Sequence, residues 1–294
     1  MKMYSPILIL AFFIMACSEE STTPSETQDV IPGASGAYFG QTPPGKTRIP
    51  FAQQIIGNWF HGEVTASPDG LEMYWSDRRG IIFSKVQNGQ WTPPAVISFS
   101  GQGSPQGSIP YDDNPVMSPD NKKLFFTSLR PIGFSTPNRE HIWYVERTST
   151  GWGEPRPLPQ NVNSVSGIHW QVSVTNDGTL YFHAVNSIGK FKIYFTRLVN
   201  GVYTDPQELT AINNFGDVHL PFMAPDESYI LFNEGAEVPS LYISFKDRNG
   251  QWLSPQSISQ IRAGTVFVSR DGKYIFSSFH WISAEILEDY SPKN

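Results

Sequence analysis

Polar residues recur at two fixed distances ahead of an aspartate-containing turn that is repeated along the chain. Counting back six and four residues from the first residue of the turn gives, in the first three copies, His61 and Glu63, Asp112 and Asn114, and His169 and Gln171. In the fourth copy His219 stands one residue out of phase. Both offsets have the same parity, so the two residues of a pair share a face if the segment is a strand. Imidazole, carboxylate and amide groups that converge on one point can ligate a divalent metal ion or act as general base and acid.

Aromatic and basic residues accompany this candidate ligand or metal site. The aromatic residues are Trp59 and Trp170, and the basic residues, which fall in expected loops, are Arg78, Arg79, Arg130 and Arg139. Aromatic rings and guanidinium groups suit an acidic sugar, through stacking and bidentate recognition of carboxylate or sulfate. Each feature also has a purely structural interpretation. Polar residues can line a water-filled channel, loop arginines can be solvated, and tryptophans can pack against neighbouring loops.

The elements that must position these residues come from an internal repeat. A Ser-Pro-Asp-Gly-like turn followed by an aromatic strand occurs five times, with the turn aspartates Asp69, Asp120, Asp177, Asp226 and Asp271. Proline presets φ at the second turn position and aspartate suits the third, so a turn role accounts for all five aspartates. A second element with glycine, an aromatic residue and proline follows the first four turns. Its aromatic residues are expected to pack between units: Trp91, Trp152, Tyr203 and Trp252.

The repeat predicts the fold. Each period holds four strand-length runs separated by turn signals, and such a unit of about 50 residues is typical of one blade of a β-propeller. The chain ends soon after the third strand of the fifth unit, so the outer strand of that unit must come from elsewhere. Pro50 to Ile56 match the outer-strand pattern and would close the ring, which removes exposed sheet edges. We therefore expect one all-β, five-bladed propeller over residues 48–290, with four strands per blade and an N-terminal strand that closes it.

The combination of Ser-Pro-Asp-Gly turns, Ile-Tyr-Tyr-like strands and Gly-x-Trp-x-x-Pro elements resembles the TolB-like (WD-repeat-like) β-propeller repeats of bacterial envelope proteins. The resemblance covers nearly all of residues 48–290. It implies a propeller that serves as an interaction platform or periplasmic partner and, less often, as an enzyme. The third turn departs from the pattern with Thr175-Asn176, and the fourth departs with Ala224 and Glu227.

The N-terminal residues indicate export and lipid attachment. Residues 1–16 carry Lys2 and then an apolar run from Ile7 that is shorter than the ~20 residues needed to span a bilayer, as in a signal peptide. Ile14-Met15-Ala16-Cys17 resembles a bacterial lipobox, so Cys17 is predicted to become the acylated N-terminus, for example with palmitate. The alternative is an ordinary signal peptide with a chance cysteine. Residues 17–47, rich in Ser, Thr, Pro, Glu and Gly, are expected to form a flexible tether.

Composition narrows the function classes. The 294 residues carry 21 Lys and Arg against 27 Asp and Glu, a net charge of -6, which argues against nucleic acid as a partner. The single cysteine excludes internal disulfides and cysteine-ligated zinc, and the sequence lacks HExxH, GxSxG, P-loop and Rossmann motifs.

We therefore expect a binding module that is lipid-anchored at the cell outer membrane, periplasmic or surface-exposed. Its partner would be an acidic polysaccharide or another envelope protein. The alternative is a polysaccharide lyase or glycoside hydrolase that uses the channel-mouth residues, with or without a divalent metal.

Overall fold

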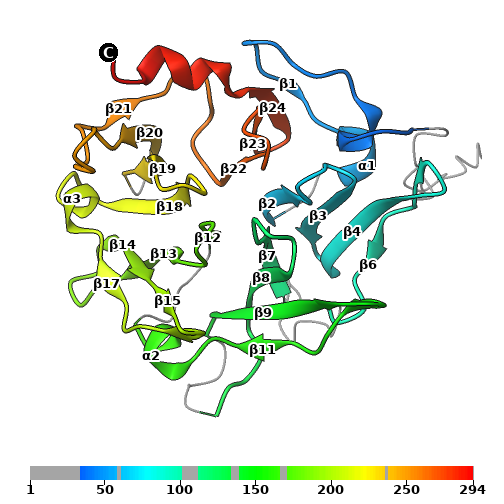
Figure 1. The fold of residues 1–294 in the computed structure, drawn as a ribbon, viewed down its shortest axis with the longest axis horizontal. Coiled ribbons are helices and arrows are strands. Elements are labelled where there is room, and N and C mark those ends of the chain that lie inside the picture. Colours follow the sequence, from blue (N-terminus) through cyan, green and yellow to red (C-terminus); the bar gives the residue numbers. More distant parts are fainter. Residues whose placement is uncertain are drawn as a thin grey trace, which may run out of the picture.

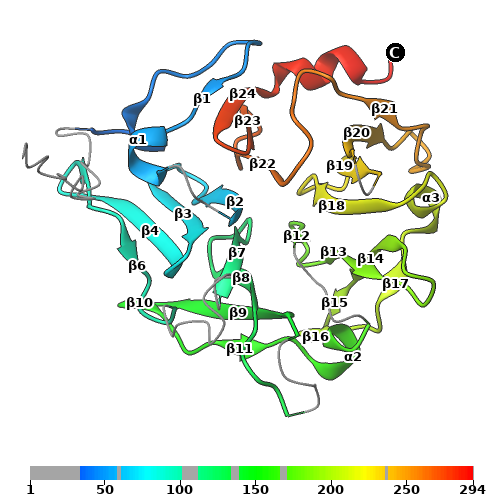
Figure 2. The same cartoon turned by 180° about the vertical axis from the view of Figure 1, so that it is seen from behind.

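Five antiparallel β-sheets surround a common axis in the computed structural model of the chain (Figure 1). The structure describes residues 34–57, 61–100, 112–133, 139–165, 171–235 and 238–293, without the side chains of residues 61–63. Each sheet is one blade, and its first strand lies nearest the axis in the views from both sides (Figures 1 and 2). The predicted all-β, five-bladed propeller is confirmed.

The blades follow one another along the chain. Blade 1 contains β2 (His61–Ala66), β3 (Glu72–Asp77), β4 (Gly80–Gln87), β5 (Gln90–Trp91) and β6 (Ala95–Val96). Blade 2 contains β7 (Asp112–Met117), β8 (Lys123–Ser128), β9 (His141–Thr148), β10 (Gly151–Trp152) and β11 (Arg156–Pro157). Blade 3 contains β12 (Val172–Val174), β13 (Leu180–Val185), β14 (Phe191–Thr196) and β17 (Gln207–Glu208), with the small hairpin of β15 (Leu198–Val199) and β16 (Val202–Tyr203).

The last two blades have the same order from the axis outward. Blade 4 contains β18 (Val218–Met223), β19 (Tyr229–Glu234), β20 (Ser240–Phe245) and β21 (Gln256–Ser257). Blade 5 contains β22 (Val266–Val268), β23 (Tyr274–Ser277), β24 (His280–Ser283) and β1 (Ile49–Pro50). The described helical segments are η1 (Tyr38–Gly40), α1 (Gln53–Ile56), α2 (Gln160–Asn163), α3 (Thr210–Asn213) and η2 (Ala284–Tyr290).

The N-terminal part of the chain closes the ring, as predicted, but with a shorter strand. Strand β1 pairs antiparallel with β24, with Ile49 opposite Trp281, and the backbone N–H of Phe51 donates to the carbonyl of Phe279 at 2.8 Å. The chain then forms helix α1 instead of continuing as a strand to Ile56. Helices α2 and α3 follow the outer strands of blades 2 and 3 in the same way. The helical turn buries Ile55 and Ile56, which an extended outer strand cannot do at once because its side chains alternate between two faces.

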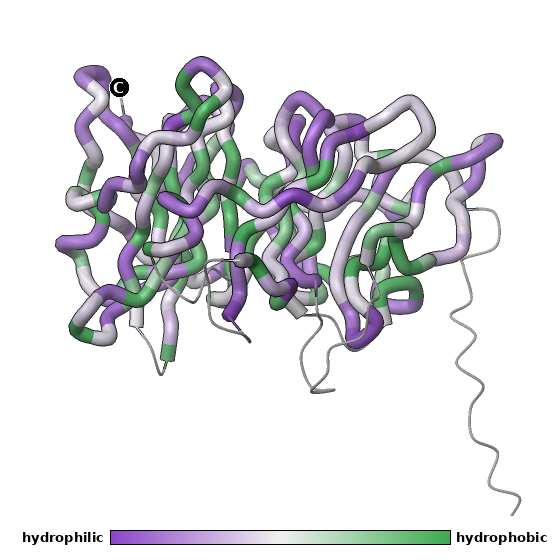
Figure 3. Tube along the Cα trace, turned by 90° about the horizontal axis from the view of Figure 1, so that it is seen from below, coloured by the Kyte–Doolittle hydropathy of each residue, from purple (hydrophilic) through white to green (hydrophobic). Residues whose placement is uncertain are grey.

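Five turns join the first and second strands of the blades, and we call the side of the ring that carries them the turn face. Each turn aspartate accepts hydrogen bonds from within its own turn: Asp69, Asp120, Asp177, Asp226 and Asp271. In the first turn, Asp69 accepts from the Ser67 hydroxyl at 2.6 Å and from the Leu71 N–H at 3.0 Å. These bonds are the ones that a structural turn role requires. Most hairpin tips on the turn face, at the top of the side view, are hydrophilic (Figure 3).

The opposite side of the ring, which we call the loop face, carries the starts of the first strands and the connections between the second and third strands. Between the two faces, aromatic residues pack from blade to blade. Trp152 of blade 2 meets Tyr74 of blade 1 with ring centroids 6.2 Å apart. Tyr203 belongs to the cluster between blades 2 and 3, Trp252 packs on the one between blades 3 and 4, and Trp91 lies in the one that includes blades 1 and 5. The prediction that these aromatic residues pack between units is confirmed.

The folded part begins before the predicted end of the tether at residue 47. Tyr38 and Phe39 are buried in the cluster shared by blades 1 and 5. The Trp91 indole donates to the carbonyl of Gly36 at 2.8 Å, and the Tyr38 N–H donates to the carbonyl of Gly70 at 2.9 Å. Two adjacent aromatic residues give this otherwise polar segment enough apolar surface to pack on the propeller.

Candidate functional site

The first strands of blades 2 and 4 contain a β-bulge at the position of the candidate site. In β7 the register shifts between Asp113 and Val116, and in β18 it shifts between His219 and Phe222. Pro115 and Pro221 occupy the same place in these bulges, and proline cannot donate to a ladder. An extra residue reverses the alternation of side chains. The expectation that residues six and four positions before the turn share one face is therefore wrong for these strands.

Buried polar residues of the second strands bind the backbone of the next blade at this level. Ser76 of blade 1 accepts a hydrogen bond from the N–H of Asn114 in blade 2 at 3.1 Å. His183 Nδ1 of blade 3 accepts from the N–H of Leu220 in blade 4 at 3.4 Å. Asn233 of blade 4 both accepts from Gly264 N–H and donates to Gly264 O, each at 2.9 Å.

In blades 2 and 4 these hydrogen bonds satisfy backbone groups that a bulge leaves without a ladder partner, and in blade 5 they hold the segment that leads into β22. Asn114 itself has φ of 51° and is buried, so its place in the bulge explains its residue type. These second-strand residues were not predicted from the sequence. The signal for them is a polar residue that directly follows the aromatic run of the second strand, as in Trp75-Ser76 and Phe232-Asn233.

Asp112, a candidate ligand or general base, forms a buried ion pair with Arg130, a candidate sugar contact. Arg130 Nε and Nη2 donate to the two carboxylate oxygens of Asp112 at 2.8 Å each, and the Ser128 hydroxyl donates at 2.7 Å. Arg130 also donates to the carbonyl of Phe99. The Asp112 side chain has no solvent exposure, and that of Arg130 is 18% exposed. The pair neutralises the carboxylate and fixes the loop that follows β8.

Side chains cross the middle of the ring between blades that are not neighbours. Gln171, a buried candidate residue of blade 3, lies with its Nε2 3.4 Å from the carbonyl of Val266 in blade 5. On the turn face, Arg270 of blade 5 donates to the carbonyl of Met117 in blade 2. Phe222 and Phe267, on the first strands of the neighbouring blades 4 and 5, are also buried and lie edge to face. Among the described residues, side chains therefore occupy part of the centre of the ring.

His219 lies in an aromatic cluster on the loop face between blades 3 and 4. Its ring centroid is 5.3 Å from that of Phe191 and 6.2 Å from that of His183. Burial lowers the pKa of His219, although its contact with the Asp217 carbonyl and the charges of Asp217 and Glu234 oppose that shift. The imidazole is therefore mostly neutral at neutral pH.

The structure describes only some of the candidate residues of the predicted metal site. In the part of the chain that the structure describes, no group of three or more His, Cys, Asp or Glu is placed to hold a metal ion. His169, Trp59, Trp170 and Cys17 lie outside the described residues, as do the side chains of His61 and Glu63.

Exposed arginines occupy the loop face on three consecutive blades. Arg78 lies between β3 and β4 of blade 1, Arg139 precedes β9 of blade 2, and Arg262 precedes β22 of blade 5. Together with Arg48, which precedes β1, we call them the arginine arc. Burial and the guanidinium groups of Arg48 and Arg262 lower the pKa of His280, so the local potential is positive.

Arg79, the neighbour of Arg78, pairs with a carboxylate of its own loop. Its Nε and Nη2 donate to the Asp77 carboxylate at 2.9 and 2.6 Å, which neutralises the charge of this arginine locally. Arg78, Arg79 and Arg139 were predicted from the sequence as candidate sugar contacts. Arg48 and His280 were not, because only the pairing of β1 with β24 brings them to the same site.

No helix among the described residues is long and apolar enough to cross a membrane.

Comparison with known proteins gives similarity of fold. No protein-family model matches the chain, and no curated protein matches it in sequence. Among solved structures, a putative TolB from Agrobacterium tumefaciens is similar at 19% identity and a TM-score of 0.49, over 74% of this chain and 68% of that one. TolB from Acinetobacter baumannii is similar at 17% identity and a TM-score of 0.46, over 72% of this chain and 47% of that one, about half its length. The gluconolactonase XC5397 from Xanthomonas campestris follows at 14% identity and a TM-score of 0.43, over 71% of this chain and 67% of that one.

Proposed function

We propose that this protein is a lipid-anchored propeller of the bacterial cell envelope that binds an acidic polysaccharide through the arginine arc on its loop face. The observation that carries the proposal is the run of exposed guanidinium groups over blades 5, 1 and 2, with the pKa of His280 lowered between Arg48 and Arg262. Guanidinium groups recognise carboxylate and sulfate in a bidentate geometry. A chain of uronate or sulfated sugars presents such groups at regular intervals.

The hydrogen bonds already made by Asp112, Asn114 and Gln171 support binding rather than catalysis by these three residues. The Asp112 carboxylate already receives three hydrogen bonds from Arg130 and Ser128. Asn114 forms part of the β7 bulge, where its N–H donates to Ser76. The Gln171 side chain donates to the backbone of blade 5. A general base or metal ligand needs a lone pair that points toward a substrate or an ion.

The entry point of the chain supports an orientation for a membrane-anchored form. The backbone N–H of Trp91, on the turn face, donates to the carbonyl of Ala34 at 3.2 Å, so an anchor at Cys17 would join the fold on that side. The intervening segment can extend to at most ~60 Å. Acylation at Cys17 would therefore keep the propeller within ~60 Å of the lipid surface, with the tether joined to its turn face and the loop face free of it.

Binding is tested with oligogalacturonate and with its methyl-esterified form, which keeps the sugar and loses the charge. We expect the purified protein to bind the charged oligomer with an affinity that falls with added salt. The triple variant Arg78→Ala, Arg139→Ala, Arg262→Ala should weaken binding by about tenfold or more, since a hydrogen bond to a charged group contributes about 1.5–3 kcal/mol.

The matched control removes three exposed cations away from the arginine arc, with Lys122→Ala, Arg156→Ala and Arg248→Ala, and should leave the affinity unchanged. The bound anion should also raise the pKa of His280, measured by NMR titration, because it offsets the two arginines. Equal binding of the esterified oligomer, or equal loss in the control, would contradict the proposal. Acylation is tested separately by labelled palmitate uptake, which Cys17→Ser should abolish.

The alternative is a polysaccharide lyase or glycoside hydrolase, and the neutral His219 is the observation that favours it. A neutral imidazole can accept a proton at neutral pH, and His183 and Asp217 lie close by. Turnover of an acidic polysaccharide that is lost in His219→Gln, with binding retained, would establish this alternative. Retained turnover in that variant would remove His219 from the mechanism.

A further inference from the structure

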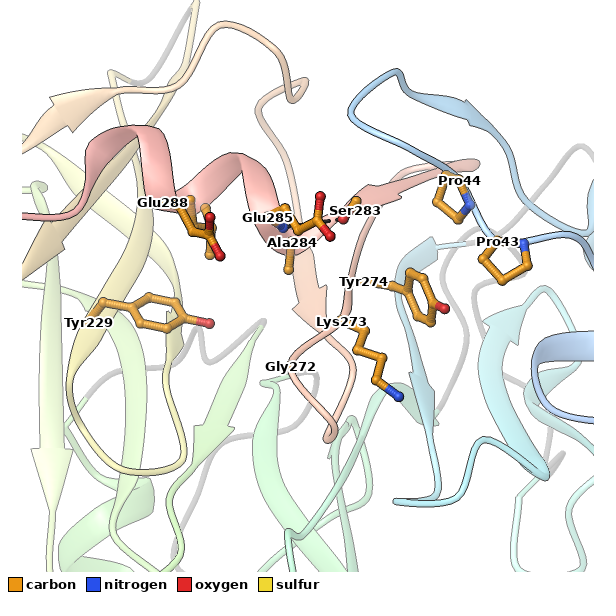
Figure 4. Close-up of a pocket in the computed structure, with 11 residues that line it drawn as sticks. Pro43, Pro44, Tyr229, Gly272, Lys273, Tyr274, Ser283, Ala284, Glu285 and Glu288 are labelled. Carbon is orange, nitrogen blue, oxygen red and sulfur yellow. Dashed lines mark hydrogen bonds between the residues drawn. The ribbon is translucent and has the colours of Figure 1, made fainter.

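A cavity lies on the turn face between blades 4 and 5, away from the arginine arc. Its volume is about 500 Å³, within the ~300–1,000 Å³ range of small-molecule sites. Tyr229 at the start of β19 forms one wall, and the blade 5 turn with Lys273 and Tyr274 forms another. Helix η2 covers it, and the prolines of the segment before β1 complete the lining (Figure 4). Four separate segments thus build one site.

Hydrogen bonds hold the walls of this cavity in place. The Ala284 N–H donates to the carbonyl of Lys273 at 2.7 Å, which ties η2 to the turn, and the Ser283 N–H donates to the carbonyl of Gly45 at 3.0 Å. The Ser283 hydroxyl accepts from the Glu285 N–H at 3.3 Å and caps η2. The cavity therefore exists before any ligand enters, which reduces the ordering cost of binding.

The cavity presents two carboxylates. Glu285 and Glu288 are three residues apart in a 3-10 helix, so they lie on the same side of it. Both are exposed, and neither forms an ion pair with another residue in the described part of the chain. The one cation of the lining, Lys273, has its ammonium group 3.3 Å from Asp271. The lining therefore carries negative charge without a counterion.

A phenolic hydroxyl is directed into the same space. Figure 4 shows the Tyr229 ring extending from β19 toward the space beneath Glu288 and Ala284. Its hydroxyl makes no hydrogen bond with any residue that the structure describes, and burial is the main cause that raises its pKa, so it stays a protonated donor. The Tyr229 ring packs against Phe222 and Phe245 and presents a fixed aromatic surface.

We propose that this cavity binds a protonated amino sugar. The ammonium group pairs with the carboxylates of Glu285 and Glu288, and a sugar hydroxyl accepts the hydrogen bond from Tyr229. An ammonium ion next to a tyrosine ring gains further attraction from the ring face. The site is independent of the arginine arc, which selects the opposite charge on the opposite face.

The test compares glucosamine trimer with N-acetylglucosamine trimer, in which acetylation has neutralised each amino group, by calorimetry at pH 6. We expect the glucosamine trimer to bind and the acetylated trimer to bind at least about tenfold more weakly, in line with charge-assisted hydrogen bonds. The variant Glu285→Gln, Glu288→Gln should lower the affinity for glucosamine trimer by about tenfold. Tyr229→Phe should lower it by about three- to tenfold, and the control Glu154→Gln, at an exposed carboxylate of blade 2, should leave it unchanged.

Each result decides the proposal. Equal binding of both trimers would show that the charge does not matter and overturn it. Absence of binding, or binding of trilysine but not of glucosamine trimer, would also overturn it. Loss of oligogalacturonate binding in the arginine variants leaves these measurements unaffected, so failure here and failure at the arginine arc are separate outcomes.

Discussion

Replacing Arg130 with methionine removes the counterion of a carboxylate that has no solvent exposure. In Arg130→Met, Asp112 keeps, among the described residues, the hydrogen bond from the Ser128 hydroxyl at 2.7 Å. An uncompensated buried charge of this kind costs about 3–5 kcal/mol. Because the Arg130 side chain is 18% exposed, water can approach from that side, and we expect a loss near the lower end, about 3 kcal/mol.

The second substitution distinguishes a structural ion pair from a functional carboxylate. Asp112→Asn alone keeps the shape and one acceptor oxygen for Arg130, so it should cost about 1–2 kcal/mol. In the Arg130→Met background, the same change removes the stranded charge and should regain part of the lost stability. The double variant should then be more stable than Arg130→Met alone, with a coupling energy of about 1–3 kcal/mol.

The assay is urea unfolding of the four proteins that form this cycle, followed by fluorescence. A matched control is the exposed pair of Arg156 and Glu146, 3.4 Å apart, where Arg156→Met should change stability by less than about 1 kcal/mol. Strict additivity of the two changes at Asp112 and Arg130 would refute the reasoning. A stability unchanged by Arg130→Met would refute it as well, and would return Asp112 to the list of candidate ligands.

Further predictions concern the turns, the closing segment and pH. Gly70→Ala should lower the stability of the protein by more than Gly272→Ala, as measured by thermal unfolding. Both glycines have positive φ, at 68° and 71°, but only a Cβ at Gly70 would meet the Tyr38 ring, at 2.9 Å. Equal losses would show that Tyr38 does not pack there. Phe51→Ala should cost about 3–5 kcal/mol, because Phe51 is 2% exposed; a loss below 1 kcal/mol would argue against ring closure by this segment. Burial lowers the pKa of His219, so the unfolded chain binds more protons as pH falls below about 6.5 and stability declines. His219→Gln should reduce that decline in unfolding curves between pH 7 and 5, and an unchanged pH profile would contradict this account.

The fold could be predicted because the information for it is local and repeated. A turn that begins at Ser67 is stabilised by bonds to Asp69 and Leu71, all within a few residues, and the same chemistry recurs in each blade. The missing outer strand of blade 5 could be deduced by counting, and β1 pairs with β24 as that count requires. Helix α1 was not deduced, because burial of Ile55 and Ile56 depends on neighbouring blades.

The candidate site was less predictable because its polar residues form hydrogen bonds and ion pairs with residues that are distant in the sequence. Strand alternation suggested that Asp112 and Asn114 act together, but the bulge at Pro115 separates their roles. Asp112 accepts from Arg130, and the Asn114 N–H donates to the Ser76 hydroxyl of the preceding blade. No spacing rule along one strand reports these pairings, since each depends on where a second strand lies.

The amino-acid sequence by itself therefore determined the number of blades, the turn chemistry and the source of the closing strand. These features follow from periodicity and from hydrogen bonds between near neighbours in the chain. Only the tertiary structure decided which polar residues are available for a ligand. Gln171 and Val266, or Arg270 and Met117, meet because the ring brings together segments that are far apart in sequence. A buried polar group must find a partner wherever the fold supplies one, and that partner determines whether the group serves the scaffold or a ligand.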